Sequence, residues 1–112
     1  MALRPEILRF KKDFDRLYKK GRSTGDKYVV VFHIANGREY SRRAFLASKK
    51  VGGAVARNRA RRLMKEGFRK IESEVLAGRD ILFIARNGAA SAGGKDVEFS
   101  IKRALGKCGL LK

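Results

Sequence analysis

The sequence has little of what disulfide-stabilised, zinc-binding or membrane proteins need. It contains one cysteine, Cys108, one histidine, His33, and no tryptophan. A lone cysteine excludes an intrachain disulfide and a cysteine-rich zinc site, so Cys108 is expected to be a plain, buried or half-buried thiol. No apolar run approaches the ~20 residues of a membrane-spanning helix, and the N-terminus lacks the apolar core of a signal peptide. These absences favour a cytoplasmic protein.

Acidic residues are also scarce and scattered. The 112 residues include 28 Lys or Arg and only 11 Asp or Glu, for a formal net charge of +17. Clustered carboxylates for a protein-held metal are missing, and a two-histidine ribonuclease lacks its second imidazole. We therefore expect no catalytic residue and no metal ligand in this chain. Because 44% of the residues are hydrophobic, the chain is expected to fold as one domain over residues 1–112, with a polyanionic partner.

The positive charge is concentrated in a central segment that contains no acid. Residues 49–62 read KKVGGAVARNRARR and lie where a helix should begin. Helix starts favour Asp and Glu, so a cationic start indicates an external polyanion, for which RNA is the best candidate. Asn58 adds a group that can read a base edge or a ribose hydroxyl. The alternative is an ordinary solvated face, but Glu66 is the only nearby acid to neutralise it.

The hydrophobic pattern predicts an α+β sandwich with helices on a mixed sheet, in the order α-β-β-α-β-α. Asn36-Gly37 is a hairpin signal between the first two strands, and a short extra strand is possible near residues 38–50. The second helix should bury Ala56, Ala60, Leu63, Met64, Gly67, Phe68, Ile71 and Val75. The predicted elements are helices over Glu6–Lys20, from Gly53 or Ala54 to Leu76, and over Lys95–Lys107, and strands over Tyr28–Ile34, Tyr40–Ser48 and Asp80–Ala85.

The first helix carries three aromatic residues at i, i+4, i+8 spacing. Phe10, Phe14 and Tyr18 are interspersed with Lys and Arg. By spacing alone, all three are expected in the core. The alternative places Phe14 and Tyr18 in an open groove, where unpaired bases stack on them. The spacing does not decide between the two. Arg42 and Arg43, in the second predicted strand, suggest that part of that strand faces solvent or a ligand.

The sequence resembles the protein subunit of bacterial ribonuclease P. The segment KKVGGAVARNRARRLMKEGFR is similar to the central signature of that family, Asp13-Phe14 matches its first helix, and DILFIAR precedes the last helix as in relatives. The resemblance covers essentially the whole chain, with Gly53, Arg61 and Lys65 as mild departures. It implies a fold like the second domain of ribosomal protein S5, with a left-handed β-α-β crossover, which is rare among such units.

The resemblance also implies a function. The family's protein forms a 1:1 complex with a large catalytic RNA that removes the 5′ leader from precursor tRNA, and the RNA with its bound Mg²⁺ performs the hydrolysis. The leader groove would involve Phe14 and Tyr18, with Tyr28, Val29 or Val31 as further members. The surface for the catalytic RNA would comprise Lys49, Lys50, Arg57, Asn58, Arg59, Arg61, Arg62, Lys65 and Arg69.

Two rival interpretations remain at this stage. A structural RNA-binding protein, such as a ribosomal protein, would use the same basic helix to hold ribosomal RNA. A stand-alone nuclease is the second rival, although the sequence assembles no acid/base pair for it.

Overall fold

The computed structural model describes residues 5–112. Over this range the chain forms three α-helices, four β-strands and one short 3₁₀ helix. Helix α3 and strand β4 agree with the sequence prediction to within one residue. The elements follow in the order α1 (Lys11–Lys20), β1 (Arg22–Gly25), β2 (Val29–Ala35), β3 (Arg42–Leu46), α2 (Ala54–Ile71), η1 (Glu72–Glu74), β4 (Arg79–Ala85) and α3 (Gly94–Lys107).

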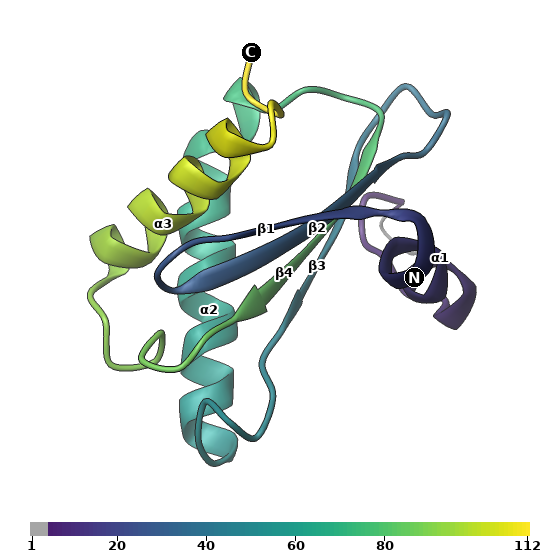
Figure 1. The fold of residues 1–112 in the computed structure, drawn as a ribbon. Helices are drawn as coiled ribbons and strands as arrows, with labels where there is room; N and C mark the ends of the chain where they lie inside the picture. The colour runs from purple at the N-terminus through teal and green to yellow at the C-terminus, as the bar shows by residue number, and fades with distance from the viewer. Residues whose placement is uncertain (1–4) are drawn as a thin grey trace.

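The four strands form one mixed sheet in the order β1-β2-β4-β3. Strands β1 and β2 are antiparallel, as are β2 and β4, whereas β3 and β4 are parallel and connected through α2. Helices α2 and α3 cover one face of the sheet, and α1 lies on the other (Figure 1). The predicted α+β sandwich with a mixed sheet is confirmed. The handedness of the β3-α2-β4 crossover stays a prediction of the resemblance.

Strand periodicity divides the core into two layers. Alternate residues of β2 and β4, such as Val31 and Phe83, are paired in register and pack with α2 and α3 in the larger cluster. The neighbouring residue Leu82 points to the opposite face and packs with Leu17 of α1. Of the residues predicted to be buried on α2 and just after it, all are buried except Ala56, which is half-buried. The larger layer fixes α2 rigidly against the sheet.

The first helix begins later than predicted, at Lys11 instead of Glu6. Residues 6–8 are extended and pair with the outer edge of β3, where Leu8 donates its N–H to the Arg43 carbonyl at 3.0 Å. The Arg43 N–H in turn donates to the Glu6 carbonyl at 2.8 Å. The helical spacing of Ile7 misled the prediction, because an unpaired strand edge offers the same backbone a long-range partner.

The predicted hairpin is wrong. Asn36-Gly37 does form a turn, with Gly37 at φ 70°, but β4 lies between β2 and β3. A strand that is apolar on both faces, as β4 is, belongs in the middle of a sheet. The extra strand is β1, which precedes β2 and is too short and polar to show a strand pattern. The helix that was predicted to reach Leu76 ends at Ile71, and η1 follows it.

Candidate nucleic-acid interface

The start of α2 presents an uncompensated positive end. Gly53 occupies the N-cap position without a side-chain hydrogen bond, and the first turn contains no acid. Gly52 adopts φ 144°, and a Cβ there would lie 2.8 Å from the Ala56 Cβ, so a glycine is required for this entry into the helix. Backbone N–H groups at such an end attract anions.

The nine residues predicted to bind the catalytic RNA all reach the surface. Arg57 and Arg61 are half-buried, and the other seven are exposed. Within residues 5–112, none of the nine forms an ion pair with an acid. Arg59 donates to the Ala90 carbonyl at 2.6 Å, which fixes its side chain against the loop before α3. We refer to these nine residues as the α2 surface. Its cations therefore remain unneutralised by acids of residues 5–112.

Asn58 has a more specific position than a solvated polar residue. Its side-chain oxygen accepts a hydrogen bond from Arg61, one turn further along the exposed side of α2. This contact orients the Arg61 guanidinium, while the Asn58 amide nitrogen keeps its donors for another group. The pair therefore presents a neutral donor beside a fixed cation, which suits a ribose or base edge next to a phosphate.

The aromatic residues of α1 divide between packing and exposure. Leu17 is the fully buried residue of this helix, whereas Phe14 is half-buried and Tyr18 is 48% exposed. The Tyr18 ring meets Phe32 of β2 edge to face, with ring centroids 5.2 Å apart. The expectation that all three aromatics are core is wrong, because Leu17 fills that role. Tyr18 and Phe14 remain available to a ligand.

The prediction that two valines of β2 line the leader groove is wrong. Val29 and Val31 have no exposed surface and belong to the core layer under α2 and α3. Strand side chains alternate between faces, so the neighbouring Val30 and Phe32 point to the α1 side instead. The prediction selected the right strand but the wrong set of alternate residues. The sequence alone does not tell which of the two sets faces α2 and α3 and which faces α1.

The α1 side of the sheet is only partly covered. We refer to Tyr18, Val30, Phe32, Leu46 and Ile84 as the open sheet face. Their side chains are half-buried or exposed, and the register of the strands places the four strand residues on the same side. Tyr28, the remaining predicted member, is half-buried and packs against the larger core layer, with its N–H donated to Ser100 Oγ at 3.0 Å.

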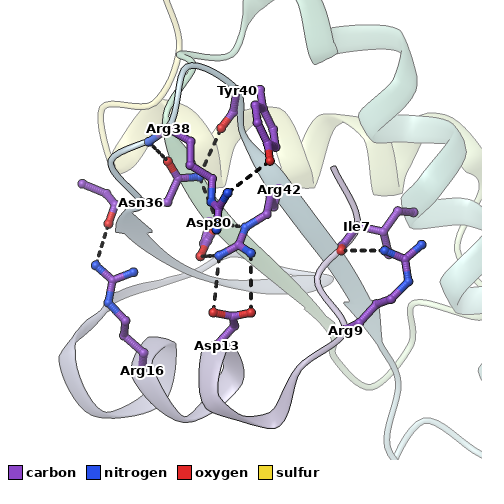
Figure 2. Close-up of polar contacts among 10 residues, drawn as sticks. Ile7, Arg9, Asp13, Arg16, Asn36, Arg38, Tyr40, Arg42 and Asp80 are labelled. Atoms are coloured by element: carbon purple, nitrogen blue, oxygen red, sulfur yellow. Dashed lines mark hydrogen bonds and ion pairs between the residues drawn. The ribbon is translucent and has the colours of Figure 1, made fainter. Parts of the chain in front are cut away.

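Arg42 does not face solvent, contrary to the sequence interpretation. Its guanidinium donates to both carboxylate oxygens of Asp80, at 2.8 and 2.6 Å, and lies 3.4 Å from Asp13 of α1. Asp80 is 1% exposed and also accepts from Asn36 Nδ2 at 3.0 Å. Figure 2 shows Arg42 between the two carboxylates. We refer to Asp13, Arg42 and Asp80 as the α1 clamp, because it ties α1 to β3 and β4.

The α1 clamp fixes the helix that borders the open sheet face. The hydrogen bonds to Asp80 raise the pKa of Arg42, although burial works against the charge. A second tie follows one turn later, where Arg16 donates to the Ala35 carbonyl at 2.9 Å. Sequence reasoning missed the clamp, since its three residues are far apart in the chain and only the sheet brings them together.

Arg43 also has structural partners within the fold. Its guanidinium lies 5.6 Å from the Phe68 ring centroid and 3.4 Å from the Glu72 carboxylate. Arg43 therefore bridges β3 to the end of α2.

Asp26, in the turn between β1 and β2, is a second acid that the sequence did not single out. Its side chain is 5% exposed and accepts from Ser100 Oγ at 2.8 Å, Arg103 at 2.9 Å and Lys107 at 2.8 Å. Burial raises the pKa of Asp26, but the hydrogen bonds from Arg103 and Lys107 outweigh it and hold the pKa well below its usual range. This contact anchors the β1–β2 turn to α3.

His33 lies inside the fold and not at the interface. It is 8% exposed, and neither ring nitrogen has a hydrogen-bond partner. Burial, followed by the positive charges of Arg79 and Arg22, lowers the pKa of His33 below its usual 6.5. Cys108 is half-buried, as predicted. These residues contribute to packing.

The described residues do not fit a protein-held metal centre. From residue 5 onward, no three His, Cys, Asp or Glu side chains gather closely enough to hold an ion. The buried acids Asp80 and Asp26 and the half-buried Asp13 already bind Arg or Lys. Within the same range, no helix combines the length and apolar character needed to span a membrane.

Comparison with known sequences gives a family. The family model described as ribonuclease P matches residues 3–109. The ribonuclease P protein component of Clostridioides difficile (strain 630) is 44% identical over 100 residues, which cover 88% of each chain. The corresponding protein of Alkaliphilus oremlandii (strain OhILAs) is 38% identical over 104 residues, 93% of this chain and 91% of that one.

Comparison with solved structures agrees. The RNase P protein of Staphylococcus aureus matches with a TM-score of 0.86 at 31% identity, covering 97% of this chain and 100% of that chain. The RNase P protein of Thermotoga maritima matches with a TM-score of 0.81 at 30% identity, covering 91% and 96%. The fold is therefore shared over nearly the whole length.

Proposed function

The chain belongs to the ribonuclease P protein family and serves as the protein subunit of that tRNA-processing endoribonuclease, and we propose that it supplies two separate RNA-binding surfaces to the complex. The first surface holds the catalytic RNA that is its partner. The second holds the single-stranded 5′ leader of precursor tRNA. The observation that carries this proposal is the set of unneutralised cations along α2.

The α2 surface is suited to the catalytic RNA. Apart from Lys49 and Lys50, which precede α2, its cations lie on a helix that is held rigidly by the larger core layer, so their spacing is fixed before RNA arrives. Preorganised Arg and Lys side chains neutralise phosphates and release counterions from the RNA. Binding should therefore weaken with salt, by about 0.9 in log affinity per tenfold increase in salt for each duplex phosphate contacted.

The open sheet face is suited to the leader. Tyr18 of α1 and Phe32 of β2 present aromatic rings, and Phe14 lies one turn before Tyr18 on α1. Unpaired bases stack on such side chains with about 1–3 kcal/mol each and little sequence preference. Exposed lysines on α1, such as Lys12 and Lys19, can accompany the leader phosphates. Leader binding adds substrate affinity away from the bond that is cut.

We place the chemistry on the RNA. Residues 5–112 gather no group of carboxylates or imidazoles for a catalytic role, and Mg²⁺ is bound mainly by the RNA, where it supplies the charge stabilisation for phosphodiester hydrolysis. The commitment of the buried acids to Arg and Lys supports this division. We also propose that one copy of the protein binds each catalytic RNA, and that the complex acts in the cytoplasm, where precursor tRNA is processed.

Reconstitution tests the proposal directly. The chain is combined with a bacterial ribonuclease P RNA at low Mg²⁺, and removal of the leader from precursor tRNA is measured. We expect efficient cleavage by the mixture, slow cleavage by the RNA alone and none by the protein alone. Cleavage by the protein alone would overturn the division of labour, and failure of the protein to stimulate the RNA would overturn its role.

A further inference from the structure

A half-open cavity lies at the outer edge of β3. Its volume is about 860 Å³, and it extends between the segment at residues 6–8, β3 and the second half of α2. This volume lies within the range of pockets that bind small organic ligands, roughly 300–1,000 Å³. Leu46 borders both the cavity and the open sheet face, but most of the lining belongs to neither of the surfaces assigned above.

The inner wall of the cavity is flat and aromatic. Phe45 is half-buried and stacks on Phe83, with ring centroids 5.1 Å apart and planes at 10°. Beside it, Arg43 is held over the Phe68 ring by its ion pair with Glu72. A planar guanidinium and an aromatic ring, both immobilised, are the two kinds of surface on which nucleic-acid bases stack.

The rim of the cavity is cationic and unpaired. Lys65 and Arg69 lie one turn apart on α2, line the cavity and are exposed. Neither forms a hydrogen bond or ion pair within residues 5–112, whereas the carboxylate of Glu72, an acid of the same lining, is engaged by Arg43. Lysine and arginine at this spacing can grip one anionic group between them.

We propose that this cavity takes one unpaired nucleotide of the catalytic RNA, with its base against Phe45 and Arg43 and its phosphate between Lys65 and Arg69. The inference rests on the proposed function, since the α2 surface brings that RNA to the rim. Sequence-specific recognition of RNA relies chiefly on such splayed-out, unpaired nucleotides. A free phosphate would use the rim alone, and a peptide would leave the two cations without a partner.

The test uses adenosine 5′-monophosphate as the probe and ribose 5-phosphate as its base-free control. Both are titrated into the ¹⁵N-labelled full-length protein at about 150 mM salt, and backbone amide shifts are followed. We expect saturable shifts for residues that line the cavity and lie outside the open sheet face, such as Phe45 and Ala77. Ribose 5-phosphate should bind about tenfold more weakly, because it lacks the stacking group.

Two variants of α2 separate the cavity from the general charge of the helix. Arg69→Gln and Arg62→Gln each remove one exposed cation, but only Arg69 lines the cavity. Arg69→Gln should weaken binding of the mononucleotide about tenfold, the loss of one charge-assisted hydrogen bond. Arg62→Gln should change it by no more than about twofold. The amide spectrum of each variant reports whether the fold is retained.

Three results would overturn the cavity proposal: equal affinity for the two probes, equal effects of the two variants, or shifts confined to the open sheet face. None of these results touches the reconstitution assay. Conversely, a protein that fails to stimulate the catalytic RNA refutes the proposed function whatever the mononucleotide does.

Discussion

Asp13 and Asp15 provide a matched pair of substitutions that tests whether the α1 clamp governs leader binding. Both residues lie on α1 and both carry one negative charge, so Asp13→Asn and Asp15→Asn alter the net charge equally. Asp13 is 13% exposed and contacts the Arg42 guanidinium at 3.4 Å. Within residues 5–112, Asp15 pairs with Lys11 alone, and the Lys11 side chain is 88% exposed. Any general electrostatic effect on RNA should therefore be the same in both variants.

The expected magnitude follows from this geometry. Two unit charges at about 4 Å attract with ~4 kcal/mol near a protein surface, but desolvation of both groups offsets most of that. Arg42 also keeps its two shorter hydrogen bonds to Asp80. We therefore expect Asp13→Asn to lower the free energy of unfolding by about 1–2 kcal/mol, and Asp15→Asn by less than about 0.5 kcal/mol. Urea denaturation followed by circular dichroism measures both.

The functional readout is the ratio of affinities for precursor and mature tRNA in the reconstituted complex. Only the precursor has a leader, so the ratio isolates contacts with the open sheet face. Loosening of α1 should reduce this ratio about threefold to tenfold in Asp13→Asn, in keeping with a loss of about 1 kcal/mol, and leave it unchanged in Asp15→Asn. If the two variants shift the ratio alike, the clamp does not position the leader surface.

Three further outcomes are expected. Tyr18→Ala should weaken binding of precursor tRNA by about 1–3 kcal/mol while leaving mature tRNA unaffected, because a stacking surface is removed; equal losses in a filter-binding assay would exclude a leader contact. Asp26→Asn should cost about 1–3 kcal/mol of stability at neutral pH, since Arg103 and Lys107 lose their carboxylate. The lowered pKa of Asp26 means that this stabilisation is present above about pH 3.8 and is lost as the pH falls through the folded-state pKa, so the variant and the parent should converge in acid unfolding experiments. His33 must stay neutral in the fold, because burial lowers its pKa, so stability should fall as the pH drops below about 6.5; His33→Leu should flatten that slope in thermal melts between pH 8 and pH 5, and an unchanged slope would contradict the assignment.

Local signals predicted the parts of the fold that depend on local physics. The apolar run of β4 and the 3.6-residue period of α2 gave the correct element types, the bounds of β4 to within one residue and the start of α2, whereas the end of α2 was placed too late, at Leu76 instead of Ile71. In both elements the spacing of apolar residues matches the residues that are buried, and such a hydrophobic pattern can be recognised in the sequence alone. The central basic segment was likewise located correctly, because the charges of α2 point outward wherever its apolar stripe points inward.

Strand order and register could not be obtained in this way. Asn36-Gly37 turns the chain as predicted, yet β3 does not pair with β2, because β4 lies between these two strands in the sheet. The same limitation affected Val29 and Val31, whose orientation depends on which side α2 and α3 pack. Arg42 was predicted at the surface for a similar reason, since the buried carboxylate that binds it lies 38 residues away.

The central place of β4 has a consequence for the order of assembly. Among the elements of residues 5–112, β4 alone joins β2 to β3, and α3 is the one helix that follows it. A chain that has been synthesised as far as α2 thus has two disconnected strand pieces, and Arg42 lacks its partner Asp80. Helix α1 is made first and contacts β2, but its packing on Leu82 and the complete α1 clamp form only after β4 has emerged, so the fold is completed with the last third of the polypeptide.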